Sequence, residues 1–309
     1  MSSCAKLSFV KPSVTQVQHT HRRTELYFVA FNHDNIQDFW LASIIYAVRK
    51  TMNASPLNLQ GKIAVVVGGT AGIGRAISLG FADAGAAVIA SARDKDKVDV
   101  VAAELEAKNC STMRVTCDVG SRASLEDLLH QVLQRFGRLD ILVNCAAKIR
   151  RAPTLTFPED EWNDILNTNL TGTLRSCQIF GKYMLERKYG RIINIASLNS
   201  FVSLSEVAAY AASKAAVVSL TRSLAVEWSK HGVLVNAIAP GVFRTELNTA
   251  LLDGTERGHE LLMRTPMARF GRVDEVAGAA VFLASDASSF ITGQTLVIDG
   301  GFLASGVNQ

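Results

Sequence analysis

The stretch Lys62-Ile-Ala-Val-Val-Val67-Gly68-Gly69-Thr70-Ala71-Gly72-Ile73-Gly74 decides the fold of this chain. The run Lys62–Val67 is mostly apolar and β-branched, which is typical of a strand buried on both faces. Gly68 permits a turn that a Cβ would block, and Gly72 and Gly74 let the backbone approach a pyrophosphate. Free amides at the start of the following helix would face the phosphates. The stretch predicts a dinucleotide site, although a tight strand–helix corner would have the same pattern.

Strand and helix patterns alternate along the rest of the chain. The predicted strands are Lys62–Val67, Ala87–Ser91, Met113–Cys117, Leu139–Val143, Arg191–Ala196, Val233–Ile238 and Thr295–Ile298. The predicted helices are Ile73–Ala84, Lys95–Ala107, Ser124–Phe136, Glu159–Arg187, Ala208–Lys230 and Val273–Ala284. Such alternation predicts an α/β fold with a Rossmann-type, doubly wound parallel sheet of about seven strands. The segment Arg244–Met267 is irregular or short-helical in pattern, and we expect it to form a small lid.

The first fifty residues differ in kind from the rest. Residues 1–35 are polar without a helical or strand period, and the apolar run Phe39–Val48 is far shorter than the roughly 20 residues of a membrane span. No secretory signal pattern is present. We expect residues 1–51 to be a poorly ordered extension from a start codon assigned too early, with Met52 as the true start. A transit peptide is the alternative. Residues 52–309 form one predicted dinucleotide-binding domain.

Composition excludes several classes of function. The net charge of +4 is mild, and no lysine or arginine cluster lies beside aromatic residues, so we expect no nucleic-acid partner and no membrane association. The five cysteines are an odd number without framework spacing, which indicates reduced thiols in a cytoplasmic protein. The six histidines form no ligand pair with a cysteine or a carboxylate, so we expect no metal site.

Tyr210 and Lys214 lie at i and i+4 in the run Tyr210-Ala-Ala-Ser-Lys214, so they share one face of a helix. An ammonium beside a phenol lowers the pKa of the phenol from its ordinary value of about 10. A phenol tuned this way can exchange a proton near neutral pH, as a reaction at an alcohol carbon requires. A chance pair on an amphipathic helix is the alternative. Ser197, at the end of the apolar run that begins at Arg191, weighs against chance.

Together these motifs resemble the short-chain dehydrogenase/reductase family over essentially all of Met52–Gln309. The family's TGxxxGxG turn has Val67 in place of Thr, and its NNAG motif is present as Asn144-Cys145-Ala146-Ala147, with two departures. A proline–glycine turn typical of the family is present as Pro240-Gly241-Val242-Phe243-Arg244-Thr245. The catalytic set of the family is matched in full by Asn169, Ser197, Tyr210 and Lys214.

The resemblance implies a role for each of these residues. Tyr210 would be the general acid/base, Ser197 would bind the reacting oxygen, and Lys214 would tune Tyr210 and hold ribose hydroxyls. Asn169 would hold a water that extends the proton relay; a capping or kinking asparagine is the alternative. The expected cofactor-binding residues are Gly68, Thr70, Gly72, Ile73, Gly74, Arg93, Asp118, Val119, Asn144, Ala146, Tyr210, Lys214, Pro240, Gly241, Phe243 and Thr245.

The end of the second predicted strand bears on the choice of dinucleotide. Ala92 stands where relatives that use NAD carry an aspartate for the ribose 2′-hydroxyl, and Arg93 follows it. A guanidinium suits a phosphate monoester. NADP(H) is therefore the preferred cofactor. NAD(H) is the alternative, because Arg93 stacked on the adenine face would serve either dinucleotide.

Arg150 and Arg151 follow the fourth predicted strand and are candidate partners for a substrate carboxylate; a solvated or inter-subunit pair is the alternative. The segments Ile149–Pro153, Thr265–Gly271 and Phe302–Gln309 resemble the gluconate 5-dehydrogenase and 2-dehydro-3-deoxy-gluconate dehydrogenase branch of the family. That resemblance implies a sugar acid whose secondary alcohol and ketone are interconverted. A 3-oxoacyl-carrier-protein reductase and a sugar 1-dehydrogenase are the alternative enzymes. A non-catalytic protein that senses the dinucleotide is an alternative from a different functional class.

The family resemblance also implies self-association. In relatives the long helices that correspond to Glu159–Arg187 and Ala208–Lys230 pair across a twofold axis. We therefore expect a homotetramer, with a homodimer as the alternative. Apart from copies of itself, the only expected partner is a small-molecule substrate.

Overall fold

The computed structural model describes residues 55–245 and 249–306. The predicted extension 1–51 and the predicted start at Met52 lie outside the described residues. Among the residues described, no helix combines the length and apolarity that a bilayer span needs.

Six parallel strands make up the sheet of the described chain, in the order β2-β1-β3-β4-β5-β6. The strands are β1 Ile63–Val67, β2 Ala87–Ser91, β3 Ile141–Asn144, β4 Gly190–Ile195, β5 Val233–Pro240 and β6 Thr295–Ile298. The order reverses between β1 and β3, which is the switch point of a doubly wound sheet. The predicted α/β class and parallel sheet are confirmed, whereas the predicted count of about seven strands is too high by one.

The error lies at Met113–Cys117, where no regular strand forms. The segment runs along the outer edge of β2 and is joined to it by a backbone hydrogen bond from Cys117 N to Ala92 O, 2.9 Å long. The hydroxyl of Ser91 donates to Val115 O at 2.8 Å. A parallel ladder needs evenly spaced backbone bonds, and here a side chain takes the carbonyl in the middle of the segment. The apolar pattern therefore reflects the burial of Val115 and Cys117, and the segment does not add a further strand to the sheet beside β2.

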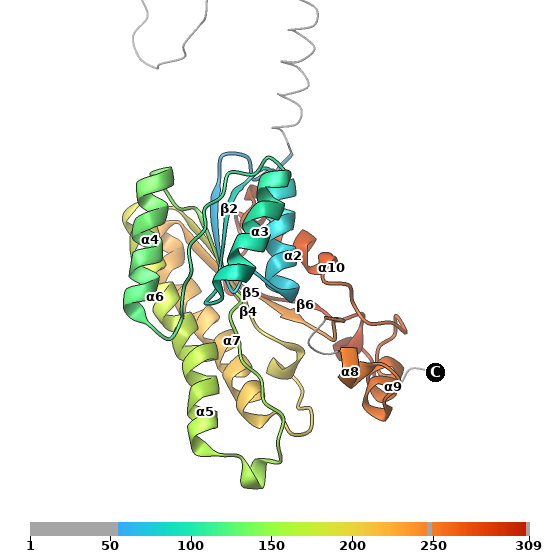
Figure 1. Ribbon diagram of the computed structural model, residues 1–309. Coiled ribbons are helices and arrows are strands. Elements are labelled where there is room, and N and C mark those ends of the chain that lie inside the picture. The colour runs from blue at the N-terminus through green and yellow to red at the C-terminus, as the bar shows by residue number, and fades with distance from the viewer. Residues whose placement is uncertain (1–54, 246–248, 307–309) are drawn as a thin grey trace, which may run out of the picture. The chain divides into compact units, whose positions relative to one another are not determined.

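Helices cover both faces of the sheet (Figure 1). The main helices are α2 Gly72–Asp83, α3 Lys95–Ala107, α4 Arg122–Phe136, α5 Glu159–Leu166, α6 Gly172–Glu186, α7 Ala208–Trp228, α8 Thr249–Leu252, α9 Glu256–Met263 and α10 Asp274–Ala284. Shorter 3-10 turns are η1 Thr154–Thr156, η3 Leu198–Ser200, η4 Ser229–His231, η5 Asp286–Ser288 and η6 Phe302–Ala304. One apolar cluster packs α2, α3 and α10 against one face, and a second packs α4, α6 and α7 against the other.

Residues of β1 alternate between the two clusters, as the period of a strand requires. Ala64 and Val66 belong to the cluster with α2, whereas Val65 and Val67 belong to the cluster with α4. All five residues of β1 are buried. The central strand is therefore apolar on both faces, which explains the unbroken run that precedes the glycines.

The predicted helix Glu159–Arg187 is continuous in space but changes its winding in the middle. A π-helical turn, η2 Asn167–Thr171, joins α5 to α6. Such turns are rare and occur frequently at functional sites. The hydroxyl of Thr173 donates to Asn169 O at 2.7 Å, which satisfies one carbonyl of the widened turn. This turn places Asn169 toward α7, as the next section describes.

Candidate active site

The glycine turn and the end of β3 approach each other closely at the carboxyl edge of the sheet. A Cβ on Gly68, whose φ is +82°, would lie 2.5 Å from Ala146 N, and a Cβ on Gly74 would lie 2.0 Å from Gly68 O. Neither position tolerates a side chain, so both glycines are required by the backbone alone. The helix α2 begins after Ala71 without a side-chain cap or an acidic residue in its first turn. Its first amides are therefore suited to an anionic ligand.

The turn between β5 and α8 meets this glycine turn. A Cβ on Gly72 would lie 3.6 Å from Thr245 Cγ2, which places the side chain of Thr245 against the start of α2. Phe243 is buried, and Gly271 packs against its ring so tightly that a Cβ there would lie 2.4 Å from the ring. Gly241 packs with equal closeness against Asp299. The structure therefore brings the predicted residues of the Pro240–Thr245 turn to the same edge as Gly72.

A narrow recess lies between the ends of β1 and β3 and the π-helical turn. Three predicted cofactor residues, Val119, Asn144 and Ala146, line it together with Val67, Thr168, Gly172 and Thr173. Asn144 Nδ2 donates to Asn194 Oδ1 at 2.9 Å, while Asn144 Oδ1 is buried without a hydrogen-bond partner. A buried acceptor without a partner is unusual. The amide of Asn144 therefore joins neighbouring strands and leaves one acceptor at the recess.

Arg93 and Asp118 follow two segments at the β2 side of this edge. Arg93 is exposed, and within residues 55–245 and 249–306 it has no ion pair. Asp118 Oδ1 accepts a hydrogen bond from Gly120 N at 2.8 Å, so this carboxylate also shapes its own turn. Arg75, on α2, is bound by both oxygens of Glu104 at 2.6 and 2.8 Å. Arg93 is thus the more available of these two guanidinium groups for a phosphate.

Three of the four catalytic candidates come together at the end of β4 and on α7. Ser197 follows β4 by two residues and is 7% exposed, and its Oγ accepts a hydrogen bond from Asn199 N at 3.2 Å. Its side chain lies near enough to Tyr210 to oppose the rise that burial causes in the pKa of that phenol. Lys214 is 3% exposed and its Nζ lies 5.7 Å from the centroid of the Tyr210 ring. Lys214 Nζ donates to Ile195 O at 2.6 Å. The predicted arrangement of hydroxyl, phenol and ammonium is present.

The pKa of Tyr210 shifts in the direction opposite to the one that its spacing from Lys214 predicts. Burial raises the pKa of Tyr210, and the hydrogen bond from Ser197 opposes this rise. Burial lowers the pKa of Lys214 to about 8. The expected lowering of the phenol's pKa by Lys214 is therefore wrong for this structure. The reason is that Nζ contacts the Ile195 carbonyl rather than the phenol oxygen, and desolvation outweighs an ammonium at that distance.

Asn169 links three parts of the site and is fully buried. Its Oδ1 accepts from Lys148 N at 2.7 Å, and its Nδ2 donates to Lys148 O at 2.9 Å. Nδ2 also donates to Ser213 Oγ at 3.0 Å, and Ser213 Oγ donates to Tyr210 O at 2.7 Å. The asparagine therefore ties the segment after β3 to the helix that carries Tyr210. Asn169 also lies within the π-helical turn, which is the kind of local distortion that the alternative of a capping or kinking asparagine expects.

Cys145 is a neighbour of the site that sequence reasoning passed over. A Cβ on Gly74 would lie 3.2 Å from Cys145 Sγ, so the thiol packs on the glycine turn. Burial raises the pKa of Cys145 to about 11, against the influence of the Lys214 charge. The thiol is therefore neutral at physiological pH. The only signal in the sequence was its departure from the family's NNAG motif.

Arg150 and Arg151 are both engaged by carboxylates of the same chain. Arg150 forms an ion pair with Glu161, and Arg151 Nε lies 2.6 Å from Glu206 Oε2. The pattern of two adjacent arginines gave no sign of these partners, which lie 11 and 55 positions away along the chain. The expected role of Arg150 and Arg151 in binding a substrate carboxylate requires free guanidinium groups, and in this structure both are already paired with carboxylates of the chain.

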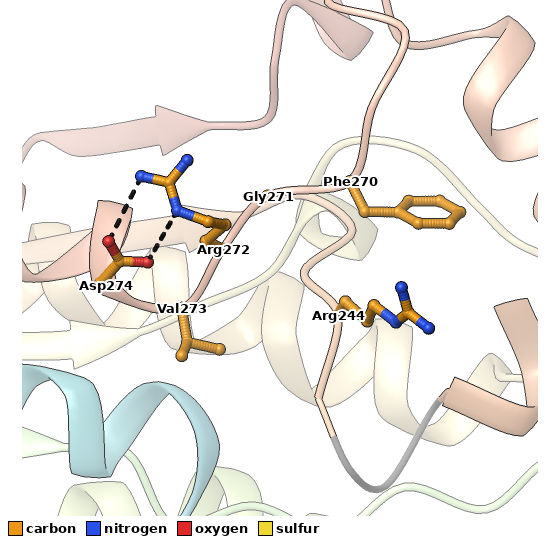
Figure 2. Close-up of a pocket in the computed structure, with 6 residues that line it drawn as sticks. All are labelled: Arg244, Phe270, Gly271, Arg272, Val273 and Asp274. Atoms are coloured by element: carbon orange, nitrogen blue, oxygen red, sulfur yellow. Dashed lines mark hydrogen bonds and ion pairs between the residues drawn. The ribbon is translucent and has the colours of Figure 1, made fainter. Parts of the chain in front are cut away.

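A larger cavity of about 420 Å³ lies beyond the Pro240–Thr245 turn, and sequence reasoning did not predict it. Its lining residues are Arg244, Phe270, Gly271, Arg272, Val273 and Asp274. Figure 2 shows Arg272 turned toward Asp274, to which its guanidinium is joined at 3.3 Å, while Arg244 and Phe270 lie away from this pair. Arg244 is itself paired with Asp253. The charged groups of this cavity are therefore largely neutralised by their neighbours.

A family model described as Enoyl-(Acyl carrier protein) reductase matches residues 68–303. This chain belongs to the short-chain dehydrogenase/reductase family. The resemblance seen in the sequence is thereby confirmed. The family assignment also confirms the predicted enzyme class, an oxidoreductase that interconverts alcohols and ketones.

Individual relatives of known name or structure cover nearly the whole of this family domain. A D-threitol dehydrogenase of Mycolicibacterium smegmatis is 43% identical over 244 residues, which are 79% of this chain and 94% of the relative. A gluconate 5-dehydrogenase of Gluconobacter oxydans is 37% identical over 248 residues, or 80% and 97% of the two chains. The solved structure of a gluconate 5-dehydrogenase of Burkholderia cenocepacia, in complex with NADP and tartrate, is 38% identical with a TM-score of 0.78. It covers 81% of this chain and 98% of that one.

Proposed function

We propose that this short-chain dehydrogenase/reductase is an NADP(H)-dependent enzyme that interconverts a secondary alcohol and a ketone of a sugar acid of gluconate type. The observation that carries the proposal is the constellation of Ser197, Tyr210 and Lys214: Ser197 and Lys214 are buried, Lys214 Nζ lies 5.7 Å from the centroid of the Tyr210 ring, and the Ser197 side chain opposes the rise that burial causes in the pKa of Tyr210. It lies at the edge of the sheet that also carries the glycine turn. The relatives named as gluconate dehydrogenases support the substrate class.

The residues present fit a dinucleotide. The close approach of Gly68 to Ala146 and the uncapped start of α2 leave backbone amides for a pyrophosphate. Arg93 offers an exposed guanidinium without an ion pair in the described chain, at the end of β2 where a 2′-phosphate is read. Thr245 lies against Gly72, where its hydroxyl could reach the nicotinamide end. We therefore assign NADP(H) as the preferred cofactor and keep NAD(H) as the alternative.

Each catalytic side chain has one role in the proposed reaction. When bound, the nicotinamide accepts or supplies the hydride. In oxidation the deprotonated, tyrosinate form of Tyr210 takes the proton of the substrate hydroxyl, and in reduction the phenol form gives its proton to the carbonyl oxygen. Ser197 donates a hydrogen bond to that oxygen as charge develops on it. Lys214 holds ribose hydroxyls and places a positive charge near the phenol, and Asn169 fixes the segment at Lys148 from which a proton relay would continue.

Neutral polyols are the second candidate substrates. The relative of 43% identity is named for D-threitol, which carries no carboxylate, and both arginines after β3 already have carboxylate partners. A polyol would need only hydroxyl-binding groups at the far end of the site. Sugar acids and polyols react by the same chemistry at the hydroxyl-bearing carbon. What distinguishes them is whether the site contains a positive group that binds the carboxylate of a sugar acid.

The test is the absorbance of reduced nicotinamide with the purified full chain. Gluconate, 5-ketogluconate, 2-dehydro-3-deoxy-gluconate, D-threitol and a 3-oxoacyl thioester are each supplied with NAD(H) and with NADP(H). Turnover of the sugar acids with NADP(H) is the expected result. Turnover of D-threitol alone selects the polyol, turnover of the thioester alone selects an acyl reductase, and consumption of no substrate would contradict the proposal.

Assembly and location are also proposals. We infer a homotetramer in the cytoplasm, with a homodimer as the alternative, in which α6 and α7 of neighbouring copies pair. Val226, on α7, is 80% exposed, which supports an apolar contact outside the monomer. The four cysteines in the described chain are unpaired, as is usual in a reducing compartment. Light scattering of the full chain gives the mass, and a monomer at micromolar concentration would contradict the assembly.

A further inference from the structure

Three charged residues from distant parts of the chain gather beside the catalytic segment; we call Arg151, Glu206 and Arg257 the mouth cluster. Arg151 follows β3 and contacts Glu206 through its Nε, 2.6 Å from Oε2. Ala152 N donates to Glu206 O at 3.0 Å. The segment at Arg151 and Ala152 is therefore joined to Glu206 by a backbone hydrogen bond as well as by the ion pair. Glu206 has a φ of +66°, a strained value for a glutamate. The surroundings therefore hold Glu206 in place four residues before Tyr210.

Helix α9 places Arg257 against the same region. Arg257 and Leu261 are at i and i+4, so they lie on one face of α9. Leu261 is buried in an apolar cluster with Leu198, Val202 and Leu204. Those three residues belong to the segment that connects Ser197 with Tyr210. The packing of Leu261 thus directs this face of α9, and Arg257 with it, to the segment that carries the mouth cluster.

Arg257 differs from its neighbours because no carboxylate of the described residues forms an ion pair with it. It is half-buried, and in the part of the chain that the structure describes it makes neither a hydrogen bond nor an ion pair. Burial is the main cause that lowers the pKa of Arg257, and the charge of Arg151 adds to this, whereas the charges of Glu206 and Glu260 oppose it. By contrast, Arg150 is neutralised by Glu161, and Arg264, which directly follows α9, is exposed and paired with Glu260 at 3.0 Å.

The charges of the mouth cluster do not balance. The guanidinium groups of Arg151 and Arg257 lie near the one carboxylate of Glu206, while the nearby Glu260 is already paired with Arg264. Among the described residues this leaves one positive charge in a partly desolvated position. Desolvating a charge without a partner costs free energy, and an anionic ligand would offset that cost. A guanidinium binds a carboxylate through two parallel hydrogen bonds. The geometry therefore suits one carboxylate that arrives from outside.

We propose that Arg257 binds the carboxylate of the substrate and makes the enzyme selective for sugar acids over neutral polyols. Glu206 holds Arg151 beside Arg257. Because Arg151 is paired with Glu206, Arg151 does not bind the substrate carboxylate by itself. The inference rests on the proposed function, because the substrate carboxylate must lie at one end of the site while a hydroxyl reacts at Ser197 and Tyr210. It adds a specificity residue on α9 to a site otherwise built from β-strand ends and α7.

The test compares wild type with Arg257→Ala and Arg257→Lys in the full chain. With NADP(H), we expect Arg257→Ala to raise the KM for gluconate about tenfold or more, since hydrogen bonds between charged groups are the stronger class. We expect kcat for gluconate to stay within about twofold, because Arg257 does not touch the reacting carbon. The KM for D-threitol should not change, and Arg257→Lys should recover part of the loss. His259→Ala, at an exposed position of α9, is the control and should leave both substrates unaffected.

Calorimetric binding of gluconate to the NADP complex separates this inference from the proposed function. Gluconate that binds to wild type and not to Arg257→Ala supports the carboxylate site even if the turnover assay finds another reaction. Equal KM for gluconate in wild type and Arg257→Ala overturns the inference while leaving the proposed function intact. Equal losses for gluconate and D-threitol make Arg257 a structural residue and also overturn it. Absence of gluconate binding to wild type contradicts the inference and the sugar-acid assignment together.

Discussion

Lys214 donates a hydrogen bond from Nζ to the backbone oxygen of Ile195 at 2.6 Å. The bond joins α7 to the carboxyl end of β4, two residues before Ser197, and so fixes the distance between the catalytic helix and the sheet edge. The ammonium is 3% exposed and faces a neutral carbonyl rather than a carboxylate. Its burial is therefore uncompensated by an opposite charge, which is why its pKa falls to about 8.

This contact predicts how stability depends on pH. Below pH 8 Lys214 is charged in both the folded and the unfolded state, and its burial penalty is fully present. As pH rises from about 8 to 10.5 the folded state loses the proton first, so folding becomes more favourable. Relative to Lys214→Met, the free energy of unfolding of wild type should increase by up to about 3 kcal/mol over that range. Urea denaturation of both proteins at pH 7.5 and pH 10 measures it. A constant difference would show that Lys214 titrates normally.

Tyr210→Phe removes the proposed acid/base and little else. We expect turnover to fall by about a hundredfold or more, because positioned proton transfer contributes rate factors of that order. Binding of NADP(H), followed by fluorescence titration, should stay within about twofold of wild type, since Phe preserves the packing of the ring. Tyr183→Phe is the control, because the Tyr183 hydroxyl is bound only by Arg187 at 3.3 Å in the described chain. Turnover of Tyr210→Phe near the wild-type value would remove Tyr210 from the mechanism.

Gly74→Ala tests the backbone cradle. The new methyl would lie 2.0 Å from Gly68 O, so the turn must shift. We expect a loss of stability of roughly 1–3 kcal/mol, typical of an overpacked position, together with weaker binding of NADP(H). In Gly278→Ala, by contrast, the methyl meets no atom within 4 Å. That variant should keep its activity and gain about 0.5–1 kcal/mol from helix propensity. Thermal melts and NADP(H) titrations compare the stability and cofactor affinity of the two variants. Equal stability and equal affinity in Gly74→Ala and Gly278→Ala would contradict the requirement for a glycine at position 74.

Arg93→Ala tests the choice of dinucleotide. Loss of a charged hydrogen-bonding partner for the 2′-phosphate should weaken NADP(H) binding by a factor of about 10 to 100. NAD(H) lacks this phosphate, so its affinity should hardly change. Lys97→Ala controls for net charge, because Lys97 lies on the neighbouring helix and is paired with Asp94 at 3.7 Å. If both dinucleotides lose affinity equally in Arg93→Ala, the side chain stacks on the adenine, as the alternative interpretation holds.

Much of the fold and of the site followed from local patterns. The apolar run before Gly68 predicted β1, because a strand buried on both faces carries no polar residue. The spacing of Tyr210 and Lys214 predicted a shared face of α7, because a helix has a fixed period. The same kind of pattern failed at Met113–Cys117, since burial leaves the same apolar signature whether or not a ladder forms. In that segment the Ser91 hydroxyl competes for a carbonyl, and a pattern of side-chain polarity does not record such competition.

The sequence by itself determined the alternating architecture, the glycine turn and the shared helix face of Tyr210 and Lys214, because each depends on residues close together along the chain. Only the tertiary structure decided which charges have partners. Arg151 and Glu206 are 55 positions apart, and Arg257 is a further 51 beyond Glu206, so no local period connects them. It also decided the direction of the Tyr210 and Lys214 pKa shifts, which depend on desolvation. Desolvation and ion pairing are set by distance in space, and the folded chain alone defines that distance.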